Sequence, residues 1–333
     1  MNRAHVSFTT RPNVKEVMPP IGPLLSIVIT GFTMARAHDL AEGLRGVKDQ
    51  TYSSIETLVI VEKSKKLFEY TKRFVDSIKL DKVQILFIEK EAGMSGGRNL
   101  GIENARGDII AFVDDDAKPF PTWAQQMVTT YEDSSIIGVM GGVIPSWEEK
   151  SMNWFPEEFY WLLGCTASLG LNDITDVRNV WGTNMSFRRE AFDKCGSFTA
   201  TFGLQLGGSK GWHDPPSEDV DFSLRVRRAT GKRIVFNPFA QVAHKITKDR
   251  FRWRFIVRRA CSVGYQRRMI KTLYTTYPVV NLLGPEHDLL KRILSRLVPR
   301  TLKILFKKPR IALRTFLLTI VILLSVTLGY MLP

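Results

Sequence analysis

Short apolar runs and helical spacings alternate along the first third of the chain. Four runs rich in Val, Ile and Leu have the length of buried strands: residues 24–30, 57–61, 83–88 and 108–113. Between them, apolar residues recur every three or four positions at residues 38–50 and 65–78, and a third helix is expected at residues 95–105, after a run of glycines. Apolar strands that alternate with helices predict an α/β fold with a mainly parallel, Rossmann-like sheet covered on both faces. Ligands of such sheets bind at the carboxyl ends of the strands, here just after Thr30, Val61 and Val113.

A different pattern governs the end of the chain. Residues 315–333 contain no charge over 19 positions, close to the roughly 20 residues that cross a bilayer core, and predict a transmembrane segment. A buried helix of a soluble protein is the alternative. The sequence does not decide whether residues 315–333 span the membrane or lie within one leaflet. Residues 291–314 hold nine Lys or Arg and no acid, which places this flank in the cytoplasm by the positive-inside rule.

An amphipathic helix is predicted where this basic region begins. Its apolar residues share one helical face: Leu289, Leu290, Ile293, Leu294 and Leu297. Lys291, Arg292 and Arg296 lie off that face, which is the pattern of a helix in the lipid headgroup layer. An ordinary surface helix packed on the body is the alternative.

Charge distribution narrows the class of protein. The 333 residues carry a net charge of +14, which suggests nucleic-acid binding at first. Residues 222–314, however, hold 24 of the 47 Lys and Arg and three of the 33 acids, so this segment carries +21 and the rest −7. A basic segment that leads into an apolar tail favours membrane lipids as partners, and no nucleic acid is expected.

Three cysteines without a CxxC pair predict neither a zinc ribbon nor a disulfide framework, and no signal peptide is expected.

Three adjacent aspartates, Asp114, Asp115 and Asp116, follow the fourth predicted strand. Their carboxylates repel one another, so a fold keeps them only where water, a cation or hydrogen-bond donors offset the repulsion. A divalent ion does this, and Mg²⁺ typically joins one or two carboxylates to substrate phosphates. A solvated acidic turn is the alternative, but the position at a strand end favours a metal site.

Glycines precede Arg98 where the third helix is predicted to begin, at Gly93, Gly96 and Gly97. Glycines let a ligand approach the backbone, a helix N-terminus attracts anions, and an arginine offers a fork of donors suited to a diphosphate. A tight turn that only starts the helix is the alternative. The pattern is neither GxGxxG nor a Walker loop, which disfavours dinucleotide and P-loop sites.

Two more candidates lie further along the chain. Glu218 and Asp219 follow Ser217 at the start of a predicted helix, where a carboxylate can take a proton from an attacking hydroxyl. Helix capping by Ser217 is the plainer explanation of this cluster. His244 follows a strand-like run, where an imidazole can complete a metal shell, although a lone histidine is more often structural.

Five motifs occur in one order: SIVIT, LRGVKDQTYSSIETLVIVE, GMSGGRNLGIENARGDIIAFVDDDA, WGTNMSFRREAF and SEDVDFSLRVRRATGKRIVFNPFAQVAHK. Together they resemble the family 2 glycosyltransferases, which have the A-type nucleotide-diphospho-sugar transferase fold. The segment HKITKDRFRWRFIVRRACSVGYQ is similar to a tail of members that build lipid-linked glycans, including archaeal dolichyl-phosphate-sugar glucuronosyltransferases. No QxxRW segment occurs, which disfavours a processive polymerase.

The resemblance implies four roles for the candidate residues. The metal, Mn²⁺ or Mg²⁺, would bridge the donor diphosphate and be held by Asp116, Asp114 and His244. The donor would be bound by Thr30, Glu62, Arg98, Asp114 and Asp115. The pocket for the donor sugar and the acceptor would be lined by Trp181, Gly182, Asn184 and Arg225. Asp219 would be the catalytic base, with Glu218 beside it near the sugars.

Two departures from the family pattern concern the nucleotide. Members usually have an Asp after the second strand that bonds the nucleobase, and this chain has Glu62 there. The usual Asn-Arg after the first strand is replaced by GFTMAR, which leaves Arg36. Uridine remains the expected base. The sugar is not specified, and a glucuronate would fit the similarity, with Arg188, Arg189 or Arg225 facing its carboxylate.

The resemblance thus implies an inverting, metal-dependent glycosyltransferase that moves one sugar from a UDP-sugar to a sugar linked to polyprenyl or dolichyl phosphate, in glycan or N-glycan precursor assembly. One alternative is a synthase that acts on the polyprenyl phosphate itself. Another is a non-catalytic protein that docks on membranes or RNA. The sequence makes no prediction of the oligomeric state.

The expected organisation follows from these patterns. An N-terminal extension at 1–23 precedes a catalytic domain at 24–250, with a nucleotide-binding half at 24–120 and an acceptor half at 121–250. Basic amphipathic membrane-associated helices follow at 251–314, and the transmembrane segment at 315–333. The catalytic domain is expected to face the cytoplasm at the cell membrane.

Overall fold

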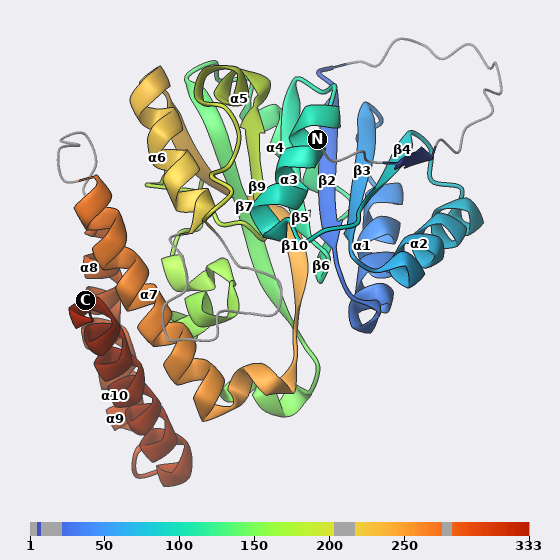
Figure 1. Cartoon of the computed structure of the whole chain (residues 1–333). Coiled ribbons are helices and arrows are strands. Elements are labelled where there is room, and N and C mark those ends of the chain that lie inside the picture. Colours follow the sequence, from blue (N-terminus) through green and yellow to red (C-terminus); the bar gives the residue numbers. More distant parts are fainter. Residues whose placement is uncertain (1–4, 8–21, 203–216, 275–281, 333) are drawn as a thin grey trace. The chain divides into compact units, whose positions relative to one another are not determined.

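The computed structural model describes residues 5–7, 22–202, 217–274 and 282–332 (Figure 1). In these residues the chain forms a ten-stranded sheet in the order β1-β4-β3-β2-β5-β9-β7-β10-β6, with β8 paired to β10. The strands are β1 (His5–Ser7), β2 (Leu25–Gly31), β3 (Ile55–Glu62), β4 (Val83–Ile88), β5 (Ile109–Asp114), β6 (Ala117–Pro119), β7 (Ile136–Trp147), β8 (Thr175–Asp176), β9 (Asn184–Arg188) and β10 (Arg233–Ile246). The helices among them are η1 (Met34–Arg36), α1 (Ala37–Lys48), α2 (Lys65–Ile78), α3 (Gly93–Asn104), α4 (Trp123–Thr130), α5 (Arg189–Cys195) and α6 (Glu218–Thr230).

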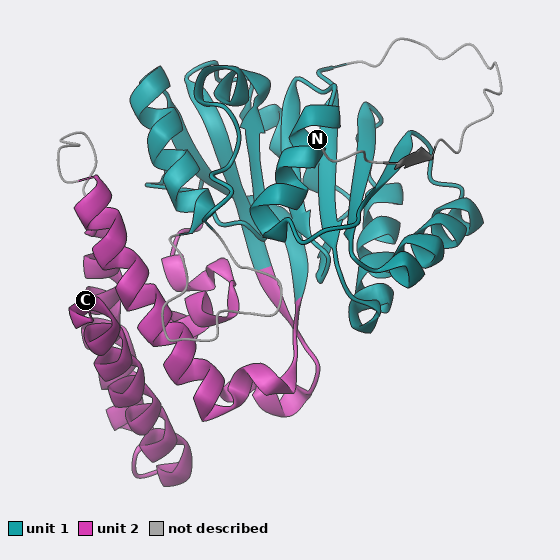
Figure 2. Cartoon of the chain, viewed as in Figure 1, with its two compact units in different colours: residues 1–143, 173–208, 217–244 teal, residues 144–172, 209–216, 245–333 magenta. Residues whose placement is uncertain are grey.

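The chain divides into two compact units (Figure 2). Unit 1 comprises residues 1–143, 173–208 and 217–244, and unit 2 comprises residues 144–172, 209–216 and 245–333. The boundary falls inside β7 and β10, so both strands continue from unit 1 into unit 2. The segment 144–172 was expected in the acceptor half, and it groups here with the C-terminal helices.

The parallel half of the sheet confirms the alternation seen in the sequence. β2 pairs in parallel with β3 and β5, and β3 pairs in parallel with β4, so the four predicted strands are neighbours. The other half is antiparallel, because β9 runs against both β5 and β7. The α/β fold with a parallel sheet region is therefore confirmed, and antiparallel pairing begins at β9.

Glycines allow α3 to pack directly on β2. A Cβ added to Gly101 would lie 2.4 Å from Cγ1 of Val28, and one added to Gly97 would lie 3.2 Å from Cγ2 of Thr30. Leu40 of α1 and Leu67 of α2 contact the opposite face of the same strand at Gly31. Helices thus cover both faces of the parallel half (Figure 1), and α3 lies closer to the sheet than a helix with side chains at these positions could.

Two local differences from the sequence expectation affect the candidate residues. Helix α3 begins at Gly93, so the glycines occupy its first turns and Arg98 lies inside the helix rather than at its start. Strand β10 is continuous from Arg233 to Ile246, so His244 lies within a strand rather than after one.

Unit 2 is built from helices around an aromatic cluster. Its elements are η2 (Lys150–Trp154), η3 (Glu157–Leu163), η4 (Thr166–Leu169), η5 (Lys248–Phe251), α7 (Trp253–Leu273), α8 (Gly284–Arg292), the π-helical turn η6 (Ile293–Leu297), α9 (Val298–Ile304) and α10 (Pro309–Met331). Phe251 packs edge-on against Trp147, Trp154 and Phe155, with ring centroids 5.2 to 6.4 Å apart. Among the described residues, α10 is the helix whose length and hydropathy suit a membrane span.

We expect Gly101→Ala to destabilise unit 1. The new methyl group would overlap two side-chain carbons of Val28, which is buried between β3 and β5, so α3 must shift away from the sheet. Overpacking of this kind lowers the free energy of unfolding by about 1–3 kcal/mol, which urea denaturation followed by tryptophan fluorescence will measure. Glu103→Ala, at an exposed position of the same helix, is the matched control. Equal stability of the two variants would contradict the close packing of α3.

Candidate active site

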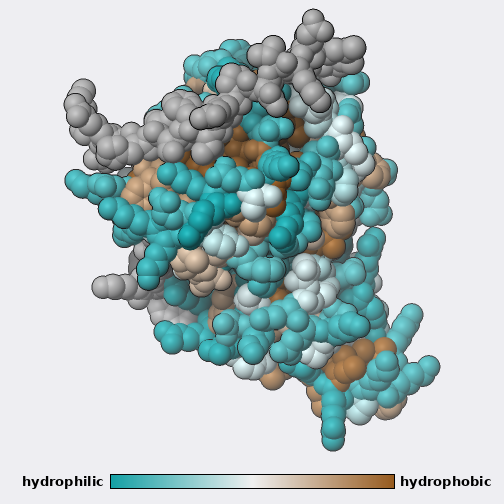
Figure 3. All heavy atoms as spheres, turned by 90° about the vertical axis from the view of Figure 1, so that its right-hand side faces the viewer, coloured by the Kyte–Doolittle hydropathy of each residue, from teal (hydrophilic) through white to brown (hydrophobic). Residues whose placement is uncertain are grey.

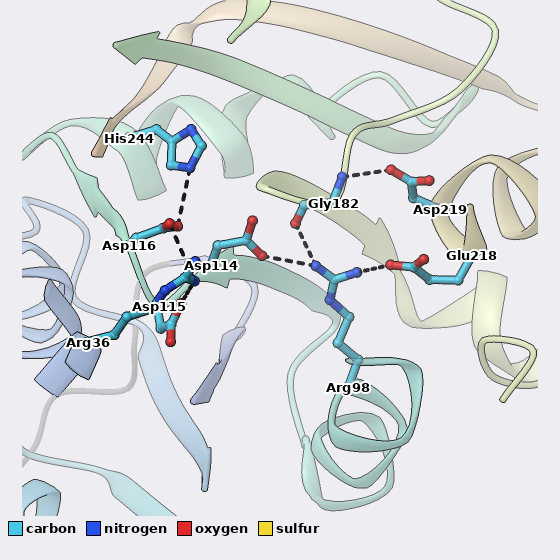
Figure 4. Close-up of polar contacts among 9 residues, drawn as sticks. All are labelled: Arg36, Arg98, Asp114, Asp115, Asp116, Gly182, Glu218, Asp219 and His244. Carbon is cyan, nitrogen blue, oxygen red and sulfur yellow. Dashed lines mark hydrogen bonds and ion pairs between the residues drawn. The ribbon is translucent and has the colours of Figure 1, made fainter. Parts of the chain in front are cut away.

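The three aspartates lie at the carboxyl end of β5, and each meets a cationic or imidazole side chain (Figure 4). Asp115 Oδ1 accepts a hydrogen bond from Arg36 Nη1 at 2.7 Å, and Asp116 Oδ2 lies 3.4 Å from the same nitrogen. His244 Nε2 lies 3.2 Å from Asp116 Oδ1. The repulsion between the carboxylates is therefore offset by side chains from η1 and β10.

Burial strengthens the electrostatic interactions at this position. Asp115 is 4% exposed and Asp116 is 8% exposed. Burial raises the pKa of the Asp115 carboxyl to about 7, although the Arg36 guanidinium opposes this shift by favouring the charged form. Oδ2 of Asp115 is buried and has no hydrogen-bond partner in the described residues.

Arg98 connects the aspartates to α6. Its guanidinium is 2% exposed, and Nη2 donates to Asp114 Oδ1 at 3.1 Å and to the carbonyl of Gly182 at 3.0 Å. Nη1 donates to Glu218 Oε1. Burial raises the pKa of the Glu218 carboxyl, and the charge of Arg98 opposes this shift. The arginine thus holds two carboxylates and one carbonyl from three separate segments in a fixed arrangement.

Asp219 lies beside this group but is held by backbone donors. The N–H of Gly182 donates to its Oδ2 at 2.8 Å, and the N–H of Val220 donates to its Oδ1 at 2.7 Å. Asp219 is half-buried, whereas Glu218 is 6% exposed. A carboxylate at the first turn of α6 is also favoured by the helix dipole.

The donor set at Asp116 and His244 fits a divalent metal that completes its shell with substrate oxygens. No group of three or more His, Cys, Asp or Glu side chains with metal-binding spacing occurs in the described part of the chain. One carboxylate and one imidazole are too few to enclose an ion, but a metal that bridges to phosphates needs only one or two protein ligands. The arrangement therefore suits an ion that binds together with a diphosphate.

Glu62 and Thr30 have structural partners at the same edge of the sheet. Glu62 Oε1 accepts hydrogen bonds from the N–H groups of Ala92 at 2.7 Å and Gly93 at 3.3 Å, where α3 begins. An anion at this place is stabilised by the helix dipole. Thr30 lies beneath Gly97 of α3. Their predicted contacts with the donor remain predictions.

The predicted pocket residues divide into two groups. Gly182 belongs to the cluster, because its N–H donates to Asp219 and its carbonyl accepts from Arg98. The carbonyl of the preceding residue, Trp181, accepts a hydrogen bond from the N–H of Asn184. The Asn184 side chain is fully buried, accepts from Trp123 Nε1, and donates to the carbonyls of Gly142 and Ala240, each at 2.9 Å. Its three bonds join four segments of unit 1, so its side chain acts as a structural connector.

The three arginines considered for a sugar carboxylate all have other partners. Arg225 bonds Asp221 and the carbonyls of Cys195 and Ser197. Arg188 donates to the backbone carbonyls of Tyr131, Asp133 and Ile136. Arg189 donates to those of Ala105 and Gly107. The structure does not bring these side chains into contact with the aspartate cluster, and their role toward the sugar stays a prediction.

Sequence reasoning did not assign Arg36 a role in the site. The signal was present, because Arg36 is the basic residue in the GFTMAR segment directly after the first strand. Its hydrogen-bond partner, Asp115, lies 79 residues away and could not be identified from spacing.

We expect Asn184→Ala to unfold more easily than the unsubstituted protein. The substitution leaves the indole N–H of Trp123 without its partner, which costs about 1–3 kcal/mol, and removes a hydrogen bond of about 1 kcal/mol from each of two buried carbonyls, so a loss of about 3 kcal/mol or more is expected. Urea denaturation will measure it. Trp123→Phe tests the hydrogen bond between the two side chains. It should lower the free energy of unfolding less in the Asn184→Ala variant than in the unsubstituted protein. Strictly additive costs would contradict the hydrogen bond between these two side chains.

Fold and site together define the class of the protein: an α/β enzyme with a carboxylate, arginine and histidine cluster at the carboxyl ends of its parallel strands. The family model described as glycosyl transferase family 2 matches residues 26–196. The chain belongs to this family and is a glycosyltransferase.

Individual relatives agree with this assignment. The chain is 31% identical to the glucosyl-dolichyl phosphate glucuronosyltransferase of Haloferax volcanii over 251 residues, 75% of this chain and 78% of that protein. It is 28% identical to the glycosyltransferase AglE of the same organism, over 61% of this chain and 64% of the relative. The mannosyltransferase PcManGT from Pyrobaculum calidifontis, solved with GDP-Man and Mn²⁺, has a similar fold, with a TM-score of 0.60, 14% identity and coverage of 95% of this chain and 89% of that one. The expected A-type glycosyltransferase fold is thereby confirmed.

Proposed function

We propose that this glycosyltransferase moves a single sugar from a UDP-sugar to a sugar on polyprenyl or dolichyl phosphate, with inversion at the anomeric carbon and dependence on a divalent metal. The observation that carries the proposal is the position of a half-buried carboxylate, Asp219, beside a cluster that suits a metal-bound diphosphate. The name of the Haloferax relative supports a dolichyl-phosphate-linked acceptor and a glucuronic acid donor. The GDP-Man and Mn²⁺ in the mannosyltransferase structure support a nucleotide-sugar donor and a metal.

Asp116 and His244 would hold the metal, with Asp114 nearby. When bound, the metal neutralises the charge that develops on the departing diphosphate. An imidazole ligand favours Mn²⁺ over Mg²⁺, which prefers oxygen ligands alone. Arg36, with its side chain 36% exposed, would supply a second positive charge to the diphosphate.

Arg98 acts in this proposal by fixing the shape of the site. Arg98 is buried and bonds Asp114, Gly182 and Glu218. It would therefore align the two acidic residues around the donor. Loss of its charge would leave Glu218 buried without a counter-charge.

Asp219 suits the role of catalytic base better than Glu218. Glu218 is buried and bonded to Arg98, whereas Asp219 is accessible and held in place by two backbone N–H groups. A base must reach the proton it removes, so the accessible carboxylate would take the proton of the acceptor hydroxyl as that oxygen attacks the anomeric carbon. The diphosphate leaves from the opposite face, which inverts the configuration.

Attachment to the membrane completes the proposal. The acceptor is carried by a lipid, and α10 is apolar enough to enter a bilayer. The nine Lys and Arg of residues 291–314 favour the cytoplasmic side. The overall test is UDP release by the detergent-purified protein with a panel of UDP-sugars and with polyprenyl phosphate or polyprenyl-phosphate-linked sugars as acceptors, with Mn²⁺ or with EDTA. No metal-dependent release with any pair would contradict the proposal.

We expect Asp116→Asn and His244→Gln each to weaken Mn²⁺ binding at least tenfold in the presence of UDP. Each removes one of two protein ligands, so the remaining ligand and the diphosphate must hold the ion. Electron paramagnetic resonance of free Mn²⁺ measures the affinity directly. Asp81→Asn, an exposed carboxylate of unit 1, is the matched control. Unchanged affinity in His244→Gln would remove His244 from the metal site.

We expect Asp219→Asn to lower the rate of sugar transfer by about 10²–10⁴-fold, the typical contribution of a general base. The amide has nearly the shape of the carboxylate but cannot accept the proton, so binding of UDP should change little. Transfer is followed by UDP release with the lipid-linked sugar acceptor, and UDP binding by calorimetry. Retained activity in Asp219→Asn, with loss in Asp116→Asn, would show instead that the acceptor is the lipid phosphate, which needs no base.

A further inference from the structure

Helix α10 exposes a row of large apolar side chains. A row along one side of the helix consists of large aliphatic residues that are each more than half exposed: Leu313, Leu317, Ile320, Leu324, Leu328 and Met331. The buried side combines two aliphatic residues, Leu318 and Ile322, with five small or polar ones: Ala312, Thr315, Thr319, Ser325 and Gly329. A surface helix in water has the opposite arrangement. On the face of the molecule drawn in Figure 3, hydrophilic side chains surround smaller hydrophobic patches. The exposed row of α10 therefore suits contact with lipid.

The buried side of α10 packs on α7 at very short range. A Cβ on Gly329 would lie 1.9 Å from the carbonyl oxygen of Cys261, and one on Gly264 would lie 2.1 Å from the carbonyl oxygen of Val326. The hydroxyls of Thr319 and Ser325 donate to carbonyls within α10, at 2.8 and 2.7 Å. Small residues and internally bonded hydroxyls are typical of helix pairs in a lipid environment.

The two helices run in the same direction, side by side (Figure 1). Cys261 meets Gly329, and seven residues further along α7 the guanidinium of Arg268 bonds the carbonyls of Met331 and Leu332 at the end of α10. Carbonyls at the end of a helix lack partners within the helix, and Arg268 supplies one. The C-terminal end of α10 is thus fixed to the middle of α7.

This pairing determines how α10 can enter a membrane. α7 is basic, with six Arg and Lys: Arg254, Arg258, Arg259, Arg267, Arg268 and Lys271. If α10 crossed the bilayer, the part of α7 packed beside it would carry arginines through the hydrocarbon layer, which is costly. A helix that lies along the surface avoids this cost, because its apolar row enters the acyl chains while the arginines of α7 stay in water or among headgroups.

We infer that α10 docks unit 2 onto one leaflet of an anionic lipid bilayer and does not cross it. Exposed basic residues before α10 and in its first two turns match anionic headgroups: Lys303, Lys307, Lys308, Arg310 and Arg314. Leu302 and Phe306, which are 51% and 94% exposed, add apolar contacts in the same region. The inference differs from the spanning segment expected for residues 315–333, which the length and hydropathy of α10 also suit. It deepens the proposed membrane attachment and does not depend on the identity of donor or acceptor.

The first test locates the end of α10. A tag with one cysteine is added after Pro333 in the full chain carrying Cys195→Ser, since Cys165 and Cys261 are buried. In intact bacterial cells, a membrane-impermeant maleimide should label this cysteine only after the inner membrane is permeabilised. Lys66→Cys, an exposed position of unit 1 in the same background without the tag, should behave identically. Labelling of the tag in intact cells while Lys66→Cys stays protected would show that α10 spans the membrane and would overturn the inference.

The second test concerns the lipid-facing row. Flotation with phosphatidylcholine vesicles containing phosphatidylglycerol should show tight binding of the full chain, with at least tenfold weaker binding to pure phosphatidylcholine. Leu317→Gln with Leu324→Gln should reduce binding to the anionic vesicles at least tenfold, because two apolar side chains lose their burial in lipid. Ile174→Gln, an isoleucine of unit 1 that is 48% exposed, is the matched control.

Equal binding of the double variant and the unsubstituted chain would overturn the docking surface. UDP release in detergent is measured in parallel for all variants, and it should stay unchanged. A failure of attachment is thereby distinguished from a failure of the proposed reaction, which would abolish UDP release in the unsubstituted chain as well.

Discussion

The mutual repulsion of Asp114, Asp115 and Asp116 is the constraint on which the rest of the site depends. Three neighbouring carboxylates, two of them almost buried, can stay in place only if positive or hydrogen-bonding groups face them. Arg98 faces the first and Arg36 the second, while the third lies between Arg36 and His244. These partners come from α3, η1 and β10, so the strand order of unit 1 must bring all three elements to the end of β5.

Close backbone packing is what brings those elements there. Gly97 and Gly101 let α3 lie directly on β2, the strand next to β5, and this places Arg98 opposite Asp114. On the antiparallel side, Asn184 bonds the carbonyls of Gly142 and Ala240, and so joins β9 to β7 and β10. His244 lies four residues beyond Ala240 on β10. The positions of the candidate site residues thus depend on close packing at Gly97 and Gly101 and on the hydrogen bonds of Asn184.

The parts predictable from the sequence were those set by local pattern. The apolar runs located β2 to β5 because each buried strand is one continuous segment, and Asp114 to Asp116 could be placed at the sheet edge because they directly follow such a run. The pairing of Arg36 with Asp115, the capping of α3 by Glu62 and the three bonds of Asn184 join residues 30 to 79 positions apart, and no period or spacing encodes them. Arg225 illustrates the same limit, because the carbonyls of Cys195 and Ser197 that it bonds lie 30 and 28 positions away in the sequence.

Hydropathy has a similar limit at α10. A stretch of about 20 apolar residues indicates that a helix can insert into a bilayer. The same stretch suits both a helix that spans the bilayer and a helix that lies in one leaflet. The difference depends on the partner of the helix. A partner with small apolar residues throughout could follow α10 across the bilayer, whereas α7 combines a small-residue contact at Cys261 and Gly264 with arginines on either side of it. Because Arg268 also bonds the last carbonyls of α10, separating the two helices would expose those carbonyls together with the small-residue surfaces. The arginines of α7 must stay in water or among the lipid headgroups. Because α10 is packed on α7, they therefore limit how deeply α10 can enter the bilayer.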